Sequence, residues 1–169
     1  SPLNYVNNIA FKDATTGINY IGYIDNGEWV LTKKIERIEI TPESLPKKTT
    51  YLKDEEIDIS GIIVNAVFSD EDIIRIEDYT SKFNEKPDNI IEIIISYEQI
   101  GITYTTSFEV GIIDLIDFVY TIDEDYNYII TDWKGTYNGE PSTKYIIPNN
   151  ANIKNNIAAT KNTVINEDN

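Results

Sequence analysis

Apolar and polar residues alternate along most of this 169-residue chain, and this two-residue period restricts its fold more than any other feature. Successive side chains of a β-strand point to opposite faces, so alternation gives one apolar face and one polar face. The clearest runs are residues 62–68, 91–97 and 102–110, whereas helical periodicity is almost absent. The chain is therefore predicted to be all-β, with a β-sandwich flanked by small meander and hairpin units.

Residues 1–34 are predicted to form a three-stranded meander, with strands at residues 5–12, 18–24 and 28–32. Asn26-Gly27 lies between the last two strands, and Asn-Gly readily adopts the positive φ angles of a tight hairpin turn. Three short strands are marginally stable alone, so we expect this unit to pack on a neighbour.

Residues 35–115 are predicted to form the sandwich, because short alternating strands are separated here by turns at residues 69–71, 84–89 and 99–101. One apolar face of each strand is expected to contribute to a common core. The predicted core residues are Ile62, Val64, Ala66, Phe68, Ile91, Ile93, Ile95, Tyr104 and Phe108.

The C-terminal third divides into a third β unit over residues 116–148 and an extended polar tail over residues 149–169. Residues 123–127 are expected to form a hairpin turn in the β unit. The tail is rich in asparagine and has few large apolar residues, so it cannot form a core of its own. We expect it to lie extended along a sheet edge, either of this chain or of another protein subunit.

The composition excludes several classes of function. The formal net charge is −15, which opposes binding to nucleic acid or to anionic membranes. No apolar run approaches the ~20 residues that insertion across a bilayer requires. The chain has no cysteine and no histidine, so Cys and His nucleophiles, His bases and Zn sites built on these residues are excluded. We expect no enzymatic activity and no cofactor.

Residues 35–113 contain a motif that extends beyond simple alternation. Its main parts are residues 46–51, 56–61, 64–70 and 101–110, which read PKKTTY, EIDISG, VNAVFSD and GITYTTSFEV. In order and spacing they resemble a bacterial immunoglobulin-like domain family found in Gram-positive surface proteins and in phage virion proteins. The resemblance implies an immunoglobulin-like β-sandwich displayed outside the cell or on a virion.

Two positions depart from that family pattern. Asp54 and Glu71 stand where the family usually has a turn glycine. Residues 117–148 show a weaker resemblance to the segment that precedes the leucine-rich repeats of surface proteins, carried by residues 118–123, 130–131, 135–136 and 146–148. Repeats rich in leucine do not follow, so a plain β-hairpin unit is the alternative interpretation.

Three groups of side chains are candidates for chemistry. Acidic residues cluster between Asp70 and Asp78, which is more typical of a solvated loop than of a paired-carboxylate site. A simple calcium-binding turn is a minor candidate at Asp123, Asp125 and Asn127, although the full calcium loop is excluded because its Gly and Glu positions hold Tyr128 and Lys134.

The third group is aromatic. Tyr126, Trp133 and Tyr137 are the candidate ligand-binding residues, since aromatic rings can stack on the apolar faces of sugars. The competing interpretation is that Trp133 closes a small core. The sequence therefore predicts a structural or adhesive module that contacts other subunits, with a polysaccharide-binding accessory module of a secreted hydrolase as the alternative.

Overall fold

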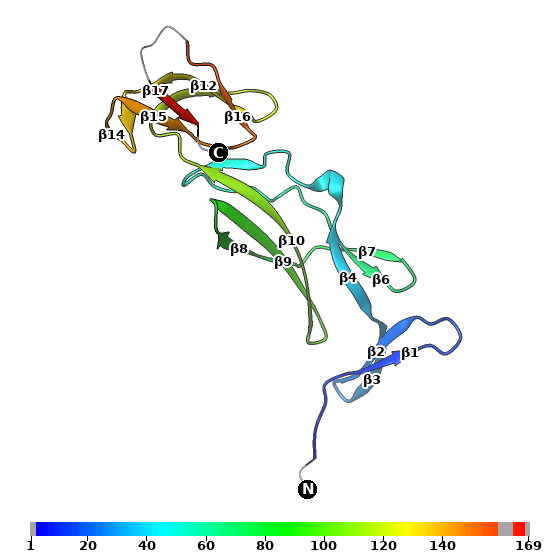
Figure 1. The fold of residues 1–169 in the computed structure, drawn as a ribbon. Coiled ribbons are helices and arrows are strands. Elements are labelled where there is room, and N and C mark those ends of the chain that lie inside the picture. Colours follow the sequence, from blue (N-terminus) through cyan, green and yellow to red (C-terminus); the bar gives the residue numbers. More distant parts are fainter. Residues whose placement is uncertain (1–2, 159–163, 168–169) are drawn as a thin grey trace. The chain divides into compact units, whose positions relative to one another are not determined.

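The protein is all-β, as the alternation predicts (Figure 1). The computed structural model describes residues 3–158 and 164–167. The regular structure in these ranges consists of strands and one 3-10 turn, Pro42–Ser44, and no α-helix occurs in them. Consequently, the described residues contain no helix with the length and apolarity needed to cross a membrane.

The chain forms two compact units, each built from segments that are distant in sequence. The first unit comprises residues 1–45, 60–84 and 93–108, and the second comprises residues 46–59, 85–92 and 109–169. These units do not follow the four consecutive divisions expected from the sequence.

An antiparallel sheet occupies the start of the first unit, with β1 (Ile9–Lys12), β2 (Asn19–Asp25) and β3 (Glu28–Lys33) in that order. The turn between β2 and β3 has φ angles of 49° at Asn26 and 80° at Gly27. Both positions therefore adopt the left-handed conformation that the Asn-Gly pair predicts, and the meander is confirmed.

A second antiparallel sheet of the first unit has the order β4-β6-β7, with β4 at Ile35–Ile40, β6 at Val64–Phe68 and β7 at Ile73–Ile76. In the β6–β7 pairing, Ala66 lies opposite Ile74. The strand β7 is an edge of this sheet. Its sequence, Ile-Ile-Arg-Ile, does not alternate, and it was not expected as a strand.

The third sheet has the order β5-β10-β9-β8. Its strands are β5 (Thr50–Leu52), β8 (Thr80–Lys86), β9 (Ile90–Gln99) and β10 (Ile102–Ile113). The short strand β5 runs parallel to the end of β10. Along β10, odd-numbered positions from 103 to 109 are exposed and even-numbered positions are buried or half-buried, so the predicted register is correct.

None of the nine predicted core residues is exposed. Ile62, Val64, Ala66, Phe68, Ile93 and Ile95 are buried, and the other three are half-buried. Within the first unit, the Gln99 side chain on β9 accepts a hydrogen bond from the Ile35 backbone N–H (3.0 Å) and donates one to the Lys33 carbonyl (2.9 Å). This link between the two sheets gives the unit a sandwich-like architecture.

The second unit contains three further small sheets. Their orders are β11-β12-β16, β13-β14 and β15-β17. The strands are β11 (Phe118–Ile122), β12 (Tyr128–Trp133), β13 (Thr136–Tyr137), β14 (Glu140–Pro141), β15 (Lys144–Ile147), β16 (Ile153–Asn155) and β17 (Val164–Glu167). The antiparallel β11–β12 hairpin confirms the turn predicted at residues 123–127.

The described part of the predicted tail belongs to this unit. The strand β16 pairs in parallel with β12, and β17 pairs in parallel with β15. Ile153 and Ile157 pack against a buried cluster that includes Tyr128, Ile130 and Tyr145. The sequence left open whether the segment lies on this chain or on a partner, and its described residues lie on this chain; residues 159–163 and 168–169 lie outside the described ranges.

Two turns have a conformation that glycine normally provides. Asp54 has a φ of 67° and Glu71 a φ of 66°. These are the two positions at which the sequence departs from the immunoglobulin-like pattern by lacking glycine. Both residues therefore hold a left-handed backbone conformation that costs a non-glycine residue some strain.

Candidate binding cleft

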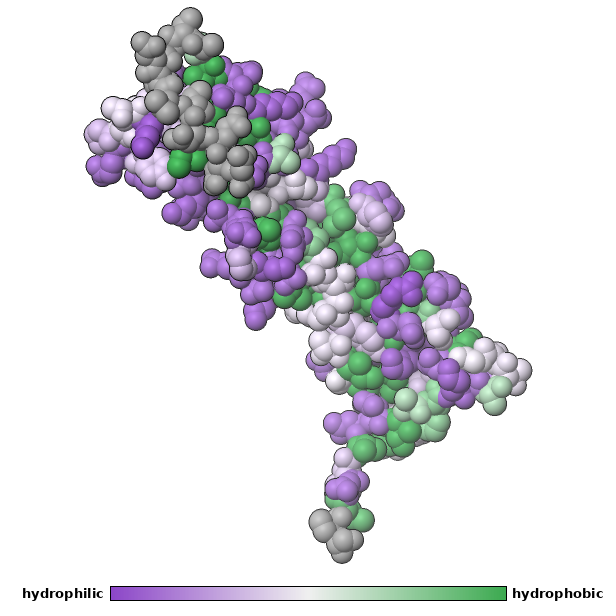
Figure 2. Space-filling model, in the orientation of Figure 1, coloured by the Kyte–Doolittle hydropathy of each residue, from purple (hydrophilic) through white to green (hydrophobic). Residues whose placement is uncertain are grey.

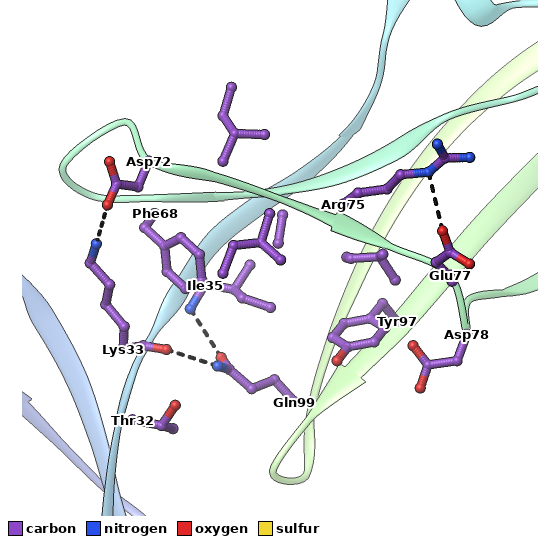
Figure 3. A pocket seen from close by; sticks show the side chains of 14 residues that line it. Thr32, Lys33, Ile35, Phe68, Asp72, Arg75, Glu77, Asp78, Tyr97 and Gln99 are labelled. Atoms are coloured by element: carbon purple, nitrogen blue, oxygen red, sulfur yellow. Dashed lines mark hydrogen bonds and ion pairs between the residues drawn. The ribbon is translucent and has the colours of Figure 1, made fainter.

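A cleft of about 430 Å³ lies beside the edge strand β7, within the first unit (Figure 3). It is lined along one side by the seven consecutive residues 72–78, and elsewhere by residues of β3, β4, β6 and β9. Its apolar lining consists of Ile35, Ala66, Phe68, Ile73, Ile74, Ile76 and Tyr97. Figure 3 shows the rings of Phe68 and Tyr97 facing the same space.

The register of the sheet explains why this cleft is apolar. Ile74 lies opposite Ala66, so both side chains are on the same face of the sheet. Ala66 is 2% exposed, whereas Ile74 is 59% exposed. The inner face of the sheet is therefore covered at β6 and at Ile76 of β7, but open to solvent at Ile74.

The backbone of β7 has an unpaired side. The Phe68 N–H donates to the Asp72 carbonyl (3.0 Å), so residues 68 and 72 face one another across the hairpin. In an antiparallel pair the backbone groups of alternate residues point toward and away from the partner strand, so those of Ile73 and Arg75 point away from β6. Among the described residues no strand lies beyond β7 in this sheet.

Charged side chains around the cleft are paired with one another. Lys33 Nζ lies 2.5 Å from Asp70 Oδ2 and 2.8 Å from Asp72 Oδ2, and Arg75 Nε lies 3.5 Å from Glu77 Oε1. The hydrogen bond between Lys33 and Asp70 raises the pKa of the lysine and lowers the pKa of the aspartate. The acidic cluster expected at residues 70–78 is thus partly neutralised by basic neighbours, as in a solvated loop.

A second exposed surface covers one face of the β1–β3 sheet. We call it the N-terminal apolar face, and Figure 2 shows hydrophobic surface there. Its members are large apolar residues that are 44–61% exposed: Ile9, Phe11, Ile24, Trp29 and Leu31. The rings of Phe11 and Trp29 meet edge to face, with centroids 6.1 Å apart, above Gly22 of the central strand.

The predicted aromatic site has a different arrangement from the one expected. Trp133 is half-buried, its ring lies 4.8 Å from that of Tyr145, and its Nε1–H donates to the Thr136 carbonyl (2.7 Å). It packs against the buried cluster of the second unit. Tyr126 and Tyr137 are exposed, but in the described part of the chain no ring contact joins either of them to Trp133. Trp133 therefore packs in the small core of the second unit, which was the alternative to a ligand-binding role.

The calcium candidate is a hydrogen-bonded turn. Asp123 Oδ1 accepts hydrogen bonds from the backbone N–H groups of Asp125 and Asn127 (2.9 Å each), and Lys154 Nζ lies 3.5 Å from Asp123 Oδ2. The bond from the Asn127 N–H lowers the pKa of Asp123. The described residues contain no cluster of three or more acidic groups that could hold a metal ion.

The cleft was not predicted from the sequence, and one short segment gives the only local indication of it. Ile73-Ile74-Arg75-Ile76 is a short apolar run directly after a predicted turn, which is typical of a strand. Its position at an edge, and the exposure of its inner face, depend on contacts with β6 and β9 that no local pattern specifies. Comparison of the sequence with family models and with curated proteins finds no match to either.

Proposed function

We propose that this chain is a non-catalytic structural or adhesive module that binds extended polypeptide segments at the free edge of β7. The observation that carries the proposal is the 59% exposure of Ile74, on the inner face of a sheet in which no described strand pairs with the outer edge of β7. An added strand gains backbone hydrogen bonds from a free edge and places alternate side chains in an adjacent apolar cleft.

The surroundings of the cleft also favour a polypeptide over a charged small molecule. Lys33 is already bound by Asp70 and Asp72, and Arg75 by Glu77. Because these charges are already paired, a ligand in the cleft would mainly contact its apolar side chains and the backbone groups of β7. An extended peptide with alternating apolar residues matches both features.

The resemblance to immunoglobulin-like modules supports a structural role outside the cell. In that setting, the module would be displayed on a bacterial cell surface or on a phage virion. The left-handed φ angles of Asp54 and Glu71 support this resemblance, because they lie where related modules have turn glycines.

Carbohydrate binding is the second candidate function, and the exposed Trp29 ring favours it. Aromatic rings that bind sugars are normally accompanied by placed polar groups. On the same face of the sheet, Trp29 has Ile24 opposite it, Gly22 diagonally across and Leu31 two residues along its own strand, and none of these offers a polar side chain. The N-terminal apolar face is therefore better suited to contact with a protein. Binding of a glycan by the wild-type chain, lost in Trp29→Ala, would instead favour the carbohydrate-binding function.

Selection of peptides from a random display library against the whole chain tests the proposal. We expect selected peptides to have alternating apolar residues and to bind the chain at least tenfold more weakly when Ile73→Pro removes the outward N–H. Proline is tolerated on a strand edge because the lost N–H faces solvent.

The matched control is Ile73→Ala, which removes the side chain but keeps the N–H, and we expect it to bind these peptides far better than Ile73→Pro. Failure to select any peptide, or equal binding by the wild-type chain and Ile73→Pro, would contradict strand addition at β7. Thermal unfolding of both variants shows whether the fold is retained.

A further inference from the structure

We infer that the cleft beside β7 receives residues 3–8 from a second copy of this chain. The inference rests on the proposed function and names the partner of the same site. The two elements that would meet are both in the first unit: a segment with exposed apolar side chains, and an edge strand with an exposed apolar cleft.

The donor segment precedes β1 and forms no regular structure of its own. Leu3 is 76% exposed, Tyr5 87% and Val6 70%, which are the three highest exposures among the large apolar residues described. Its C-terminal end is fixed, because Asn8 Nδ2 donates a hydrogen bond to the Ile100 carbonyl (2.8 Å). The segment is therefore tethered and exposed, and it carries three large apolar side chains among its six residues.

The pattern of this segment suits the cleft. Leu3 and Tyr5 are two residues apart, so in an extended strand both side chains point to the same face. That face would enter the apolar space lined by Phe68, Ile74 and Tyr97. Asn4 would then lie on the opposite face, toward solvent.

The length and the charge of the segment agree with this placement. Six extended residues span about 20 Å at roughly 3.3 Å per residue, which matches the stretch of residues 72–78 along the cleft. None of residues 3–8 carries a charged side chain. The segment would therefore neither disturb the Lys33–Asp72 and Arg75–Glu77 pairs nor leave a charge unpaired in the apolar cleft.

A contact of this kind joins two different surfaces. Each copy offers one donor segment and one acceptor cleft, so the contact is head to tail and extends into chains unless a rotation closes a ring. The strongly negative net charge of −15 disfavours association at most surfaces. The uncharged donor segment reduces that repulsion at this contact.

Sedimentation velocity over a concentration series tests the inference with two defective variants. Leu3→Ser with Tyr5→Ser removes the donor side chains, and Ile73→Pro blocks the acceptor edge. We expect the wild-type chain to form larger species as concentration rises and each variant to remain monomeric. A mixture of the two variants should stop at dimers, because only one productive contact is left. Asn4→Ser is the control, because Asn4 lies on the opposite face of the strand, and it should associate like the wild-type chain.

A synthetic peptide of residues 1–9 provides the second measurement. We expect it to bind the donor-defective chain and to lose at least tenfold in affinity when Ile73→Pro is added. If library peptides bind at β7 but this peptide does not and the wild-type chain stays monomeric, the second copy is not the occupant and the proposed function stands. If neither class of peptide binds, both are wrong. If the peptide of residues 1–9 binds but the wild-type chain stays monomeric at every concentration, the inference that a second copy occupies the cleft is also wrong.

Discussion

The indole ring of Trp29 lies so close to Gly22, on the neighbouring strand, that a methyl group at position 22 would overlap its Cζ2 and Cη2 atoms. Gly22 thus gives Trp29 the space to cross the central strand and meet Phe11. The N-terminal apolar face depends on this pair.

Gly22→Ala should displace the Trp29 ring, because side-chain atoms can move away more readily than backbone. We expect one of the two indole N–H signals in an NMR spectrum to shift, and the other, from Trp133, to stay in place. The loss of stability should be about 1–3 kcal/mol, the usual cost of adding a methyl group to occupied space, and it should lie toward the lower value because the exposed Trp29 ring can move. Gly61→Ala, where the added methyl meets nothing within 4 Å, should leave both signals unchanged. An unaffected Trp29 signal in Gly22→Ala would contradict this packing.

Glu71→Gly should stabilise the protein, because Glu71 has a φ of 66° that glycine adopts without a steric penalty. The free energy of unfolding should rise by about 1 kcal/mol. Loss of the exposed Arg37–Glu71 ion pair (3.5 Å) reduces this gain only slightly. Chemical denaturation measures it. Glu77→Gly lies nearby without a positive φ and should destabilise; a gain from Glu77→Gly equal to that from Glu71→Gly would show that the backbone conformation is not the cause.

Asp117→Asn should destabilise the second unit. The buried Asp117 carboxylate accepts hydrogen bonds from the backbone N–H groups of Asn138 and Gly139 (2.9 Å each) and from the Thr136 hydroxyl (2.8 Å). An amide presents donors where acceptors are needed, so about 1–3 kcal/mol should be lost. Asp114→Asn is the control, because Asp114 is exposed and, within the described part of the chain, accepts one hydrogen bond, from the Ile116 N–H. Equal stability of the two variants would argue against this role for Asp117.

The stability of the fold should fall as pH rises above about 10, partly because of Tyr128. Burial, with the nearby Glu55 carboxylate, raises the pKa of Tyr128 to about 12. Between pH 10 and 12 the unfolded tyrosine loses its proton while the folded one keeps it, so the free energy of unfolding decreases over this window. Tyr128→Phe removes this contribution. A difference between the wild-type chain and the variant that does not change from pH 9 to pH 12 would contradict the raised pKa.

Local sequence patterns predicted the elements whose specification is local. The Asn26-Gly27 turn and the alternation from Ile102 to Val110 could be predicted, because adjacent residues determine the turn conformation and which face of a strand each side chain occupies. The hairpin around residues 123–127 was predicted for the same reason.

The missed elements depend on distant partners. The strand β16 lies parallel to β12 with Ile153 beside Tyr128, and β17 lies parallel to β15 with Ile165 beside Tyr145. Parallel pairing at separations of 20 to 25 residues leaves no turn signal between the partners. The cleft was missed because the exposure of Ile74 follows from the absence of a neighbouring strand in the described sheet, which its own sequence does not encode.

The central claim is that β7 accepts a polypeptide strand, and amide hydrogen exchange at β7 tests it most directly. We expect the amides of Ile73 and Arg75, which point away from β6, to exchange at least tenfold more slowly when a selected peptide is bound than in the free chain. The amides of Ile74 and Ile76, which face β6, should change much less, because they are already paired. Bound peptide that leaves Ile73 and Arg75 unprotected would contradict strand addition at this edge.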